Sequence, residues 1–183
     1  NFSDKQIDEV KIEMKEMGDP ALNVDGVCGA IRILNDKFLN LLYVVSSSGV
    51  KNYSLFEELK KVRDEDIEIR LQFSCHTTDN EQRRILSPRL DMFSLEEISE
   101  VVENWYDENQ KVTLNFVPFK KFELSSSKIV DLFDPKKVFI KISYVDFHDF
   151  VKKEGLLDKE IHQIQDFVES LRNSGFNLAY RNK

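Results

Sequence analysis

The stretch IEIRLQFSCHTTDN, residues 67–80, decides the fold class, because an apolar, β-rich run ends there in a group of polar residues. The pattern of Ile67–Phe73 predicts a buried strand. Three other segments have the same form, with polar residues at or just past the end of a predicted strand. Because strand ends in a repeating β/α chain meet at one rim, we expect these polar residues to line a single site. The three segments are MGDPALN at 17–23, SSSG at 46–49 and ISYVD at 142–146.

Between these segments the hydrophobic pattern alternates between short β-rich runs and helical periodicity. The predicted strands are Lys11–Glu16, Leu41–Ser46, Ile67–Phe73, Lys111–Val117, Val138–Tyr144 and Phe176–Tyr180. The predicted helices are Asn23–Asn35, Leu55–Val62, Glu81–Leu86, Leu95–Tyr106, Ser125–Phe133 and Lys159–Asn173. Ser94 with Glu97 forms the capping box of the helix that follows, and Gly175 stands where the last helix is expected to stop.

Strand and helix in alternation predict an α/β fold with parallel strands and right-handed crossovers. The strands are apolar nearly throughout, as in a sheet that helices cover. With 183 residues the chain is shorter than the roughly 250 of a closed eightfold barrel. We therefore expect one domain, residues 1–183, built as a partial (β/α) barrel or open twisted sheet with about five to six β/α units.

Composition narrows the function classes. The net charge is −7 and the pI is about 5.1, which disfavours a general nucleic-acid coat protein, and no DNA partner is expected. Basic residues still cluster locally, so an RNA-facing patch is an alternative to simple solvation. No apolar run reaches the roughly 18 residues of a membrane span, and a cytoplasmic location is expected. The clusters are Arg83 with Arg84 and Arg89, Lys120 with Lys121, and Lys136 with Lys137.

Each motif has a functional and a structural interpretation. Glycine at Gly18 permits close backbone approach and Asp19 offers a carboxylate to an ammonium group, but an ordinary βα turn explains both. Ser48 with Gly49 offers a hydroxyl and free amides to a ribose or phosphate, or simply forms a turn.

The Cys75–His76 pair has poor geometry for nucleophilic catalysis, because neighbours in an extended strand point to opposite faces. Ser74 and His76 share a face and can line a pocket together, although a structural histidine is an equal alternative. The two cysteines, Cys28 and Cys75, provide neither a disulfide framework nor metal-ligand spacing. No residue is assigned a catalytic or metal-binding role.

In this order, the motifs resemble those of the radical S-adenosylmethionine (SAM) enzymes that methylate carbon 2 of adenine in ribosomal and transfer RNA. Gly-Met-Gly-Glu-Pro-Leu-Leu-Asn of that family is matched by EMGDPALN at 16–23, and Ser-Thr-Ser-Gly by SSSG at 46–49. Ser-Leu-His-Ala-Pro-Asn-Asp with its Arg-rich turn is similar to 74–80 and 83–88. Val-Asn-Leu-Ile-Pro-Tyr-Asn is similar to 140–146, so the resemblance covers nearly the whole chain.

The resemblance implies a SAM site. Gly18 and Asp19 would contact the amino and carboxylate end of SAM, and Asp146 would lie near the adenosine. The methionine and ribose portions would be held by Ser48 and by the Ser74, Cys75 and His76 run. Short polar side chains at one barrel rim suit a small zwitterionic nucleoside.

The chain also departs from the family. The Cys-x-x-x-Cys-x-x-Cys motif that holds the [4Fe–4S] cluster is absent, so a cluster is expected only in an intact protein, and the chain is interpreted as lacking the first β/α unit. Asp19 replaces a glutamate, Asp146 an asparagine, and Asn115 stands where the family usually has an acidic residue.

The sequence therefore predicts the SAM-binding part of a radical SAM enzyme, with structured rRNA or tRNA as its expected partner. The alternative is a non-catalytic module of the same fold that binds a nucleotide or a partner. A third, weaker alternative is an unrelated β/α enzyme whose site lies at the same rim.

Overall fold

The computed structural model describes residues 10–15, 18–108, 110–144 and 161–180. Within these residues, six parallel strands form one sheet whose spatial order, β1-β2-β3-β4-β5-β6, is also the order along the chain. The strands are β1 (Val10–Met14), β2 (Leu41–Ser47), β3 (Ile69–Ser74), β4 (Val112–Phe116), β5 (Val138–Ile142) and β6 (Asn177–Tyr180).

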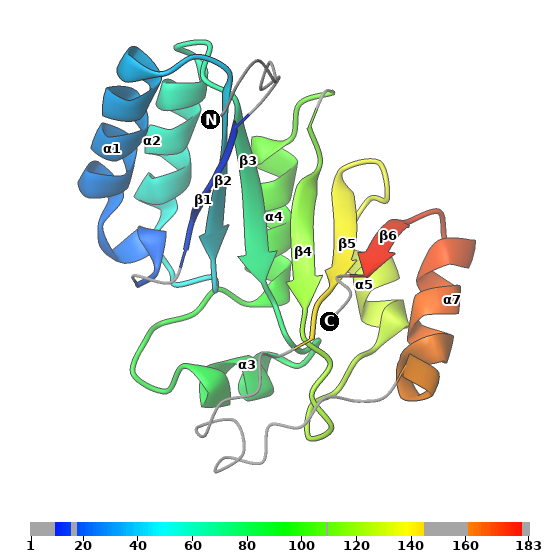
Figure 1. Ribbon diagram of the computed structural model, residues 1–183. Helices are drawn as coiled ribbons and strands as arrows, with labels where there is room; N and C mark the ends of the chain where they lie inside the picture. The colour runs from blue at the N-terminus through cyan, green and yellow to red at the C-terminus, as the bar shows by residue number, and fades with distance from the viewer. Residues whose placement is uncertain (1–9, 16–17, 109, 145–160, 181–183) are drawn as a thin grey trace, which may run out of the picture.

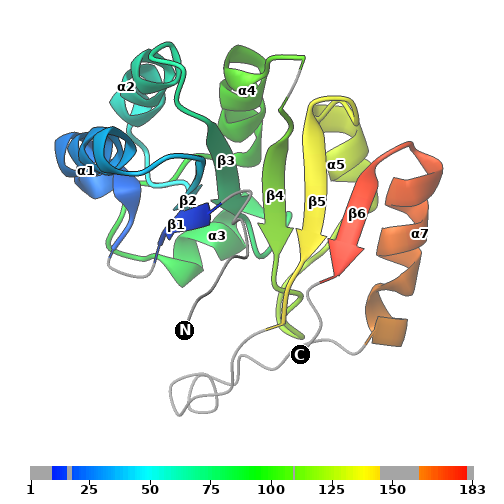
Figure 2. The same cartoon turned by 45° about the horizontal axis from the view of Figure 1, so that its top comes forward.

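The helices follow the strands and lie on one face of the sheet (Figures 1 and 2). A sheet that always winds to its next neighbour by right-handed crossovers puts every crossover helix on the same side and curves into a partial barrel. The exception is α3, which lies with the loops at the carboxyl ends of the strands (Figure 1). The helices are α1 (Val24–Lys37), α2 (Tyr53–Arg63), α3 (Asn80–Leu86), α4 (Leu95–Trp105), α5 (Ser126–Leu132) and α7 (Gln165–Asn173), with 3₁₀ turns η1 (Pro20–Leu22) and η2 (Ile161–Ile164).

The predicted fold class is confirmed, and element boundaries differ from the predictions by a few residues. The capping box is present, since Ser94 accepts from the Glu97 amide while the Glu97 carboxylate accepts from the Ser94 amide. Gly175 ends α7 with a φ of 88°. The predicted helix at 159–173 is η2 followed by α7, and its first two residues lie outside the described ranges.

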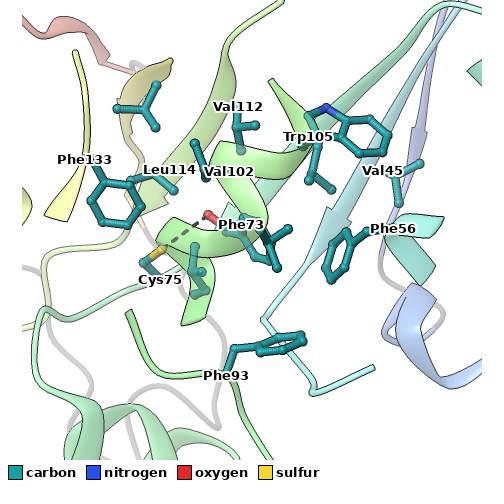
Figure 3. Packing of buried hydrophobic residues seen from close by; sticks show 14 of the residues in the cluster. Val45, Phe56, Phe73, Cys75, Phe93, Val102, Trp105, Val112, Leu114 and Phe133 are labelled. Carbon is teal, nitrogen blue, oxygen red and sulfur yellow. Dashed lines mark hydrogen bonds between the residues drawn. The ribbon is translucent and has the colours of Figure 1, made fainter. Parts of the chain in front are cut away.

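The main core lies between the sheet and its helices (Figure 3). Alternate strand residues point into it, so Phe73 and Leu114 pack with Trp105 and Val102 of α4. Each fully buried side chain of this size contributes roughly 1.5–3 kcal/mol through removal of apolar area from water. The other strand residues face the concave side, which the helices leave open (Figures 1 and 2).

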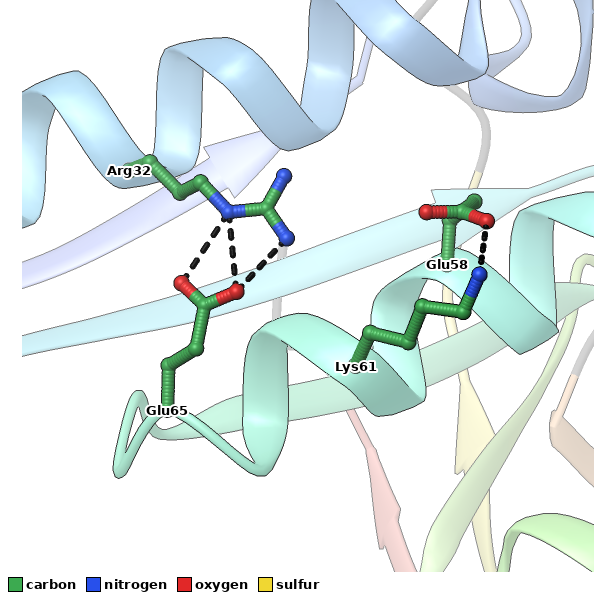
Figure 4. Close-up of polar contacts among 4 residues, drawn as sticks. All are labelled: Arg32, Glu58, Lys61 and Glu65. Atoms are coloured by element: carbon green, nitrogen blue, oxygen red, sulfur yellow. Dashed lines mark hydrogen bonds and ion pairs between the residues drawn. The ribbon is translucent and has the colours of Figure 1, made fainter.

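The first two helices are also joined at their surface (Figure 4). Arg32 of α1 donates from Nη2 to Oε1 of Glu65, just beyond α2, at 2.7 Å, and from Nε to both carboxylate oxygens at 3.0 Å. Lys61 pairs with Glu58 within α2 at 2.6 Å. Both pairs are solvent-exposed, so they contribute little to stability, and only the Arg32–Glu65 pair links α1 to the end of α2.

Candidate SAM site at the carboxyl ends of the strands

Asp19 fastens the turn after β1 to the end of β2. Its Oδ1 accepts the Ser47 hydroxyl at 2.9 Å and the Ala21 amide at 3.0 Å. Its Oδ2 accepts the Ser48 amide at 2.7 Å and the Ser48 hydroxyl at 2.6 Å. A carboxylate has about four acceptor positions, so these bonds occupy the whole group. The role that the structure shows for Asp19 is therefore to position the loop after β2.

His76 occupies a strained position at the end of β3. Its φ is 63°, in the left-handed region that a side chain with a Cβ rarely adopts. Its Nδ1 is buried and has no hydrogen-bond partner among the described residues. Burial, with the nearby Arg83 cation, lowers the pKa of His76 from 6.5 to about 4. The imidazole is thus neutral at pH 7 and keeps one ring nitrogen free for a ligand or a water.

Arg83 of α3 ties the ends of β2 and β3 together from beneath. The side chain is 2% exposed, and its Nη1 donates to the Cys75 carbonyl at 3.0 Å while Nη2 donates to the Ser48 carbonyl at 3.1 Å. Its Nε has no hydrogen bond, and no carboxylate in the described part of the chain pairs with it. A buried guanidinium without a paired carboxylate is costly.

His76 and Arg83 line one small cavity of about 20 Å³. A cavity of this size holds about one water molecule, so by itself it is too small for a ligand such as SAM. Its walls come from the loops after β2 and β3, and the residues that line it are Ser48, Ser74, Cys75, His76, Arg83, Leu86, Ser87 and Met92.

Cys75 presents its backbone to this cavity and its side chain to the core. It is 1% exposed, packs in the helix-facing cluster and donates weakly to the Phe73 carbonyl at 3.8 Å (Figure 3). Burial raises the pKa of the Cys75 thiol to about 11, and burial likewise raises the pKa of Cys28. Both thiols therefore stay protonated near neutral pH and lack the thiolate character of a nucleophile or iron ligand.

The rim continues across β4 and β5. Asn115 accepts the Ser143 hydroxyl through Oδ1 at 2.7 Å, and its carbonyl accepts the Cys75 amide at 2.8 Å. The loops after β3 and β4 are joined by the Thr78 amide, which donates to the Glu123 carbonyl at 3.0 Å. Asp146, the predicted adenosine contact, lies outside the described residues.

Of the predicted site residues, Asp19 and Ser48 bond directly, and Ser48, Ser74, Cys75 and His76 share the small cavity. Gly18 has a φ of 103° and open space where a Cβ would stand, so its backbone is accessible. Sequence reasoning missed Ser47 and the buried position of Arg83. The sequence did contain a signal for Ser47. In a run of three serines at a strand end, neighbouring hydroxyls point to opposite faces of the sheet, so both faces receive one.

The basic residues that were predicted as a possible patch differ in their surroundings: some are buried, some form ion pairs and some are exposed. Arg83 is buried, so it does not belong to a surface patch. Lys137 pairs with Glu103 and Arg84 with Glu81. Arg89 and Lys120 are exposed in the loops after β3 and β4.

Solved structures support the fold class. A radical SAM methyltransferase from Sphaerobacter thermophilus superposes with a TM-score of 0.66 at 18% identity, over 93% of this chain and 50% of that one. A domain of pyruvate-formate lyase-activating enzyme from Bacteroides vulgatus gives a TM-score of 0.64 at 11% identity, over 93% of this chain and 98% of that domain. The chain thus has the partial-barrel fold of the radical SAM enzymes.

Curated relatives add similarity in sequence. A probable dual-specificity RNA methyltransferase RlmN of Pseudothermotoga lettingae is 27% identical over 90% of this chain. The protein of the same name from Petrotoga mobilis is 26% identical over 97% of this chain. The chain spans about half the length of these relatives, 48% and 51%. No family model matches the chain. The resemblance to the radical SAM adenine carbon-2 RNA methyltransferases, predicted from the motifs, is confirmed by these matches.

In the described part of the chain no group of three or more His, Cys, Asp or Glu residues is arranged to hold a metal ion. Among the described residues no helix is both long enough and apolar enough to cross a membrane.

Proposed function

We propose that this chain supplies the SAM-binding part of a radical SAM enzyme that methylates RNA, with carbon 2 of adenine as the target. The observation that carries the proposal is the similarity to RlmN proteins over 90% or more of the chain, combined with the convergence of the motifs at one rim. Motifs that are distant in sequence but adjacent in space, on the fold these enzymes use, favour a shared ligand over independent turns.

The rim residues fit SAM. The backbone at Gly18 lies open to the ammonium end, and Ser48, Ser74 and the neutral His76 offer polar groups of the kind that methionine and ribose atoms need. Asp19 contributes by holding Ser47 and Ser48 in place, and Cys75 contributes as a wall of the rim cavity. Asp146 is proposed as the adenosine contact. When bound, SAM supplies the methyl group and, after reductive cleavage, a radical.

The [4Fe–4S] cluster does not fit this chain. Ligation needs several thiolates, whereas the sequence has two cysteines, and both side chains are buried in the core. We therefore assign the cluster to an intact protein that includes further sequence and derive no step through it.

The lack of cluster ligands in this chain favours a second candidate, which is a non-catalytic module of the same fold that binds a nucleotide or a partner. The two candidates share the SAM rim and differ in whether cluster ligands accompany it. A cluster-dependent methyl transfer to adenine in an RNA substrate distinguishes them.

For the RNA partner we propose a structured RNA, rRNA or tRNA, bound over the loops after β3 and β4. Arg89 and Lys120 are exposed there, on an otherwise acidic protein. Phosphate contacts from such residues would make binding salt-dependent. Cytoplasmic location is part of the same proposal, since RNA modification by these relatives needs access to cellular RNA.

The test is calorimetric titration of the chain with SAM. We expect binding that weakens at least tenfold in His76→Ala, because the ligand loses a partner and a wall of its site. Asp19→Ala should also weaken binding, because Ser48 loses its fixed position, whereas Asp36→Ala, an exposed carboxylate on α1, should bind as the parent does. Absence of SAM binding, or equal binding by all three variants, would reject the proposed rim site.

A further inference from the structure

The concave face of the sheet carries a second hollow, lined by none of the residues around the rim cavity. It encloses about 410 Å³, within the roughly 300–1,000 Å³ range of small-molecule sites. The hollow extends along the strands from Arg70 to Lys141, which lies level with Ser74 because the register pairs Ser74 with Asn115 and Asn115 with Lys141. Its lining residues are Lys11, Val44, Arg70, Gln72, Thr113, Phe139, Lys141, Ala179 and Tyr180.

The polarity of this face is unusual for a parallel sheet. Such sheets are commonly apolar on both faces, because both are packed. Here the residues in register across the hollow, such as Gln72 with Thr113, are polar, while their strand neighbours Phe73 and Leu114 face the core. A face with this pattern is built to meet water or a polar ligand.

Cations predominate in the hollow although the protein carries a net charge of −7. Lys11, Arg70 and Lys141 come from β1, β3 and β5, so the positive charge is distributed around the hollow. Lys11 and Lys15 share the single carboxylate of Glu13, and this pairing lowers the pKa of Glu13 to about 2.

The guanidinium of Arg70 is held in place with donors to spare. Arg70 bonds Glu68 through one Nη at 3.0 Å, and a guanidinium has five N–H donors. Gln72 donates to the Ser46 hydroxyl at 2.9 Å, and its Oε1 receives the Lys141 ammonium at 3.4 Å. This chain of side chains spans β2, β3 and β5 and fixes the side of the hollow nearest the rim.

The chemistry that matches these groups is a phosphate with an attached planar ring. Arginine and lysine on separate strands surround an anion, and the partly buried ring of Phe139 is an apolar surface for a base. We propose that this hollow is a second binding site that takes a phosphate-bearing nucleotide through Arg70 and Lys141. None of the residues that line the hollow lines the rim cavity, so the proposal stands whether or not the rim binds SAM.

The test uses uridine 5′-monophosphate, which lacks adenine and therefore does not mimic SAM. We expect it to bind the full chain in calorimetric titrations, and uridine, without the phosphate, to bind at least tenfold more weakly. Arg70→Gln and Lys141→Met should each weaken binding at least fivefold, because each removes a charge-assisted contact. Lys60→Met, on α2 in the helical layer, is the matched control and should bind as the parent does. Circular dichroism verifies that each variant is folded.

The source of the phosphate is identified by a second titration, with a 5′-phosphorylated RNA hexamer. If free nucleotide and hexamer both depend on Arg70 and Lys141, the site accepts the end of an RNA strand; if only the nucleotide does, the ligand is a small molecule. The proposal is overturned if the parent binds neither probe, if uridine binds as tightly as its monophosphate, or if Arg70→Gln and Lys141→Met leave the affinities unchanged.

Discussion

At the scale of single residues, Gly49 shows how closely the rim is packed. Its φ is 87°, and a Cβ there would lie 2.7 Å from Nη2 of Arg83. Gly29, in the middle of α1, has open space instead. The two positions therefore respond to alanine in opposite directions.

We expect Gly49→Ala to lower the free energy of unfolding by roughly 2 kcal/mol or more, from left-handed strain and displacement of Arg83. Gly29→Ala should raise it by about 0.5–1 kcal/mol through helix propensity. Urea denaturation of both variants measures the difference. Equal stabilities would mean that the contact between Gly49 and Arg83 is not maintained in solution.

His76 gives the rim a pH dependence. Its pKa falls from 6.5 to about 4 on folding, so protonation favours the unfolded chain. This contribution to stability is complete above about pH 6.5 and is lost as the pH falls from there toward 4. In His76→Gln the loss should disappear, whereas the exposed His162→Gln should retain it; urea midpoints between pH 4 and 7 are the measurement. A His76→Gln profile that parallels the parent would contradict the assignment.

The location of a residue at the rim could be predicted where a motif stood at a strand end, but not where burial decided the position of the side chain. Asp19, Ser48 and His76 stood out as polar residues at strand ends, and they do lie around one rim. Arg83 sits beside Arg84 in sequence, and no local pattern distinguishes them. Only the return of α3 beneath the ends of β2 and β3 makes one buried and the other exposed.

At the scale of elements, α4 is the helix with the most complete end. Its capping box pairs two amides that would otherwise lack partners, and its inner face fills the main core. The capping box was also recognisable in the sequence, from Ser94 and Glu97. The strands were equally recognisable as apolar runs, but their polar concave residues gave no signal of the hollow, because side chains from separate strands create it.

We expect Ser94→Ala to lower the free energy of unfolding by about 1 kcal/mol, since the Glu97 amide loses its acceptor. Ser99→Ala, on the exposed side of the same helix, should be neutral or slightly stabilising. Chemical denaturation of the pair tests this, and a Ser94→Ala variant as stable as Ser99→Ala would show that the cap does not contribute.

At the scale of the whole molecule, stability should fall from the centre of the sheet to its edges. β3 and β4 have a strand on both sides, whereas β1 and β6 each pair with one strand among the described residues. In hydrogen exchange followed by mass spectrometry, Ile69–Ser74 should therefore exchange more slowly than Val10–Met14 and Asn177–Tyr180. Protection of β1 as long-lived as that of β3 would mean that its outer edge is covered.

The winding of the sheet could be predicted because strand and helix alternate so regularly. The position of Asp146 could not be tested, because it lies outside the described residues. The net charge of −7 did not predict the basic residues on the concave face of the sheet, because composition averages over surfaces of opposite charge.

The left-handed backbone of His76 has an evolutionary consequence. Glycine or asparagine would relax that turn, so a random library screened only for heat resistance should return such changes at this position. Such variants would lack the imidazole of His76. In the proposed SAM site, the strained backbone of His76 would be kept for ligand affinity at the expense of thermal stability.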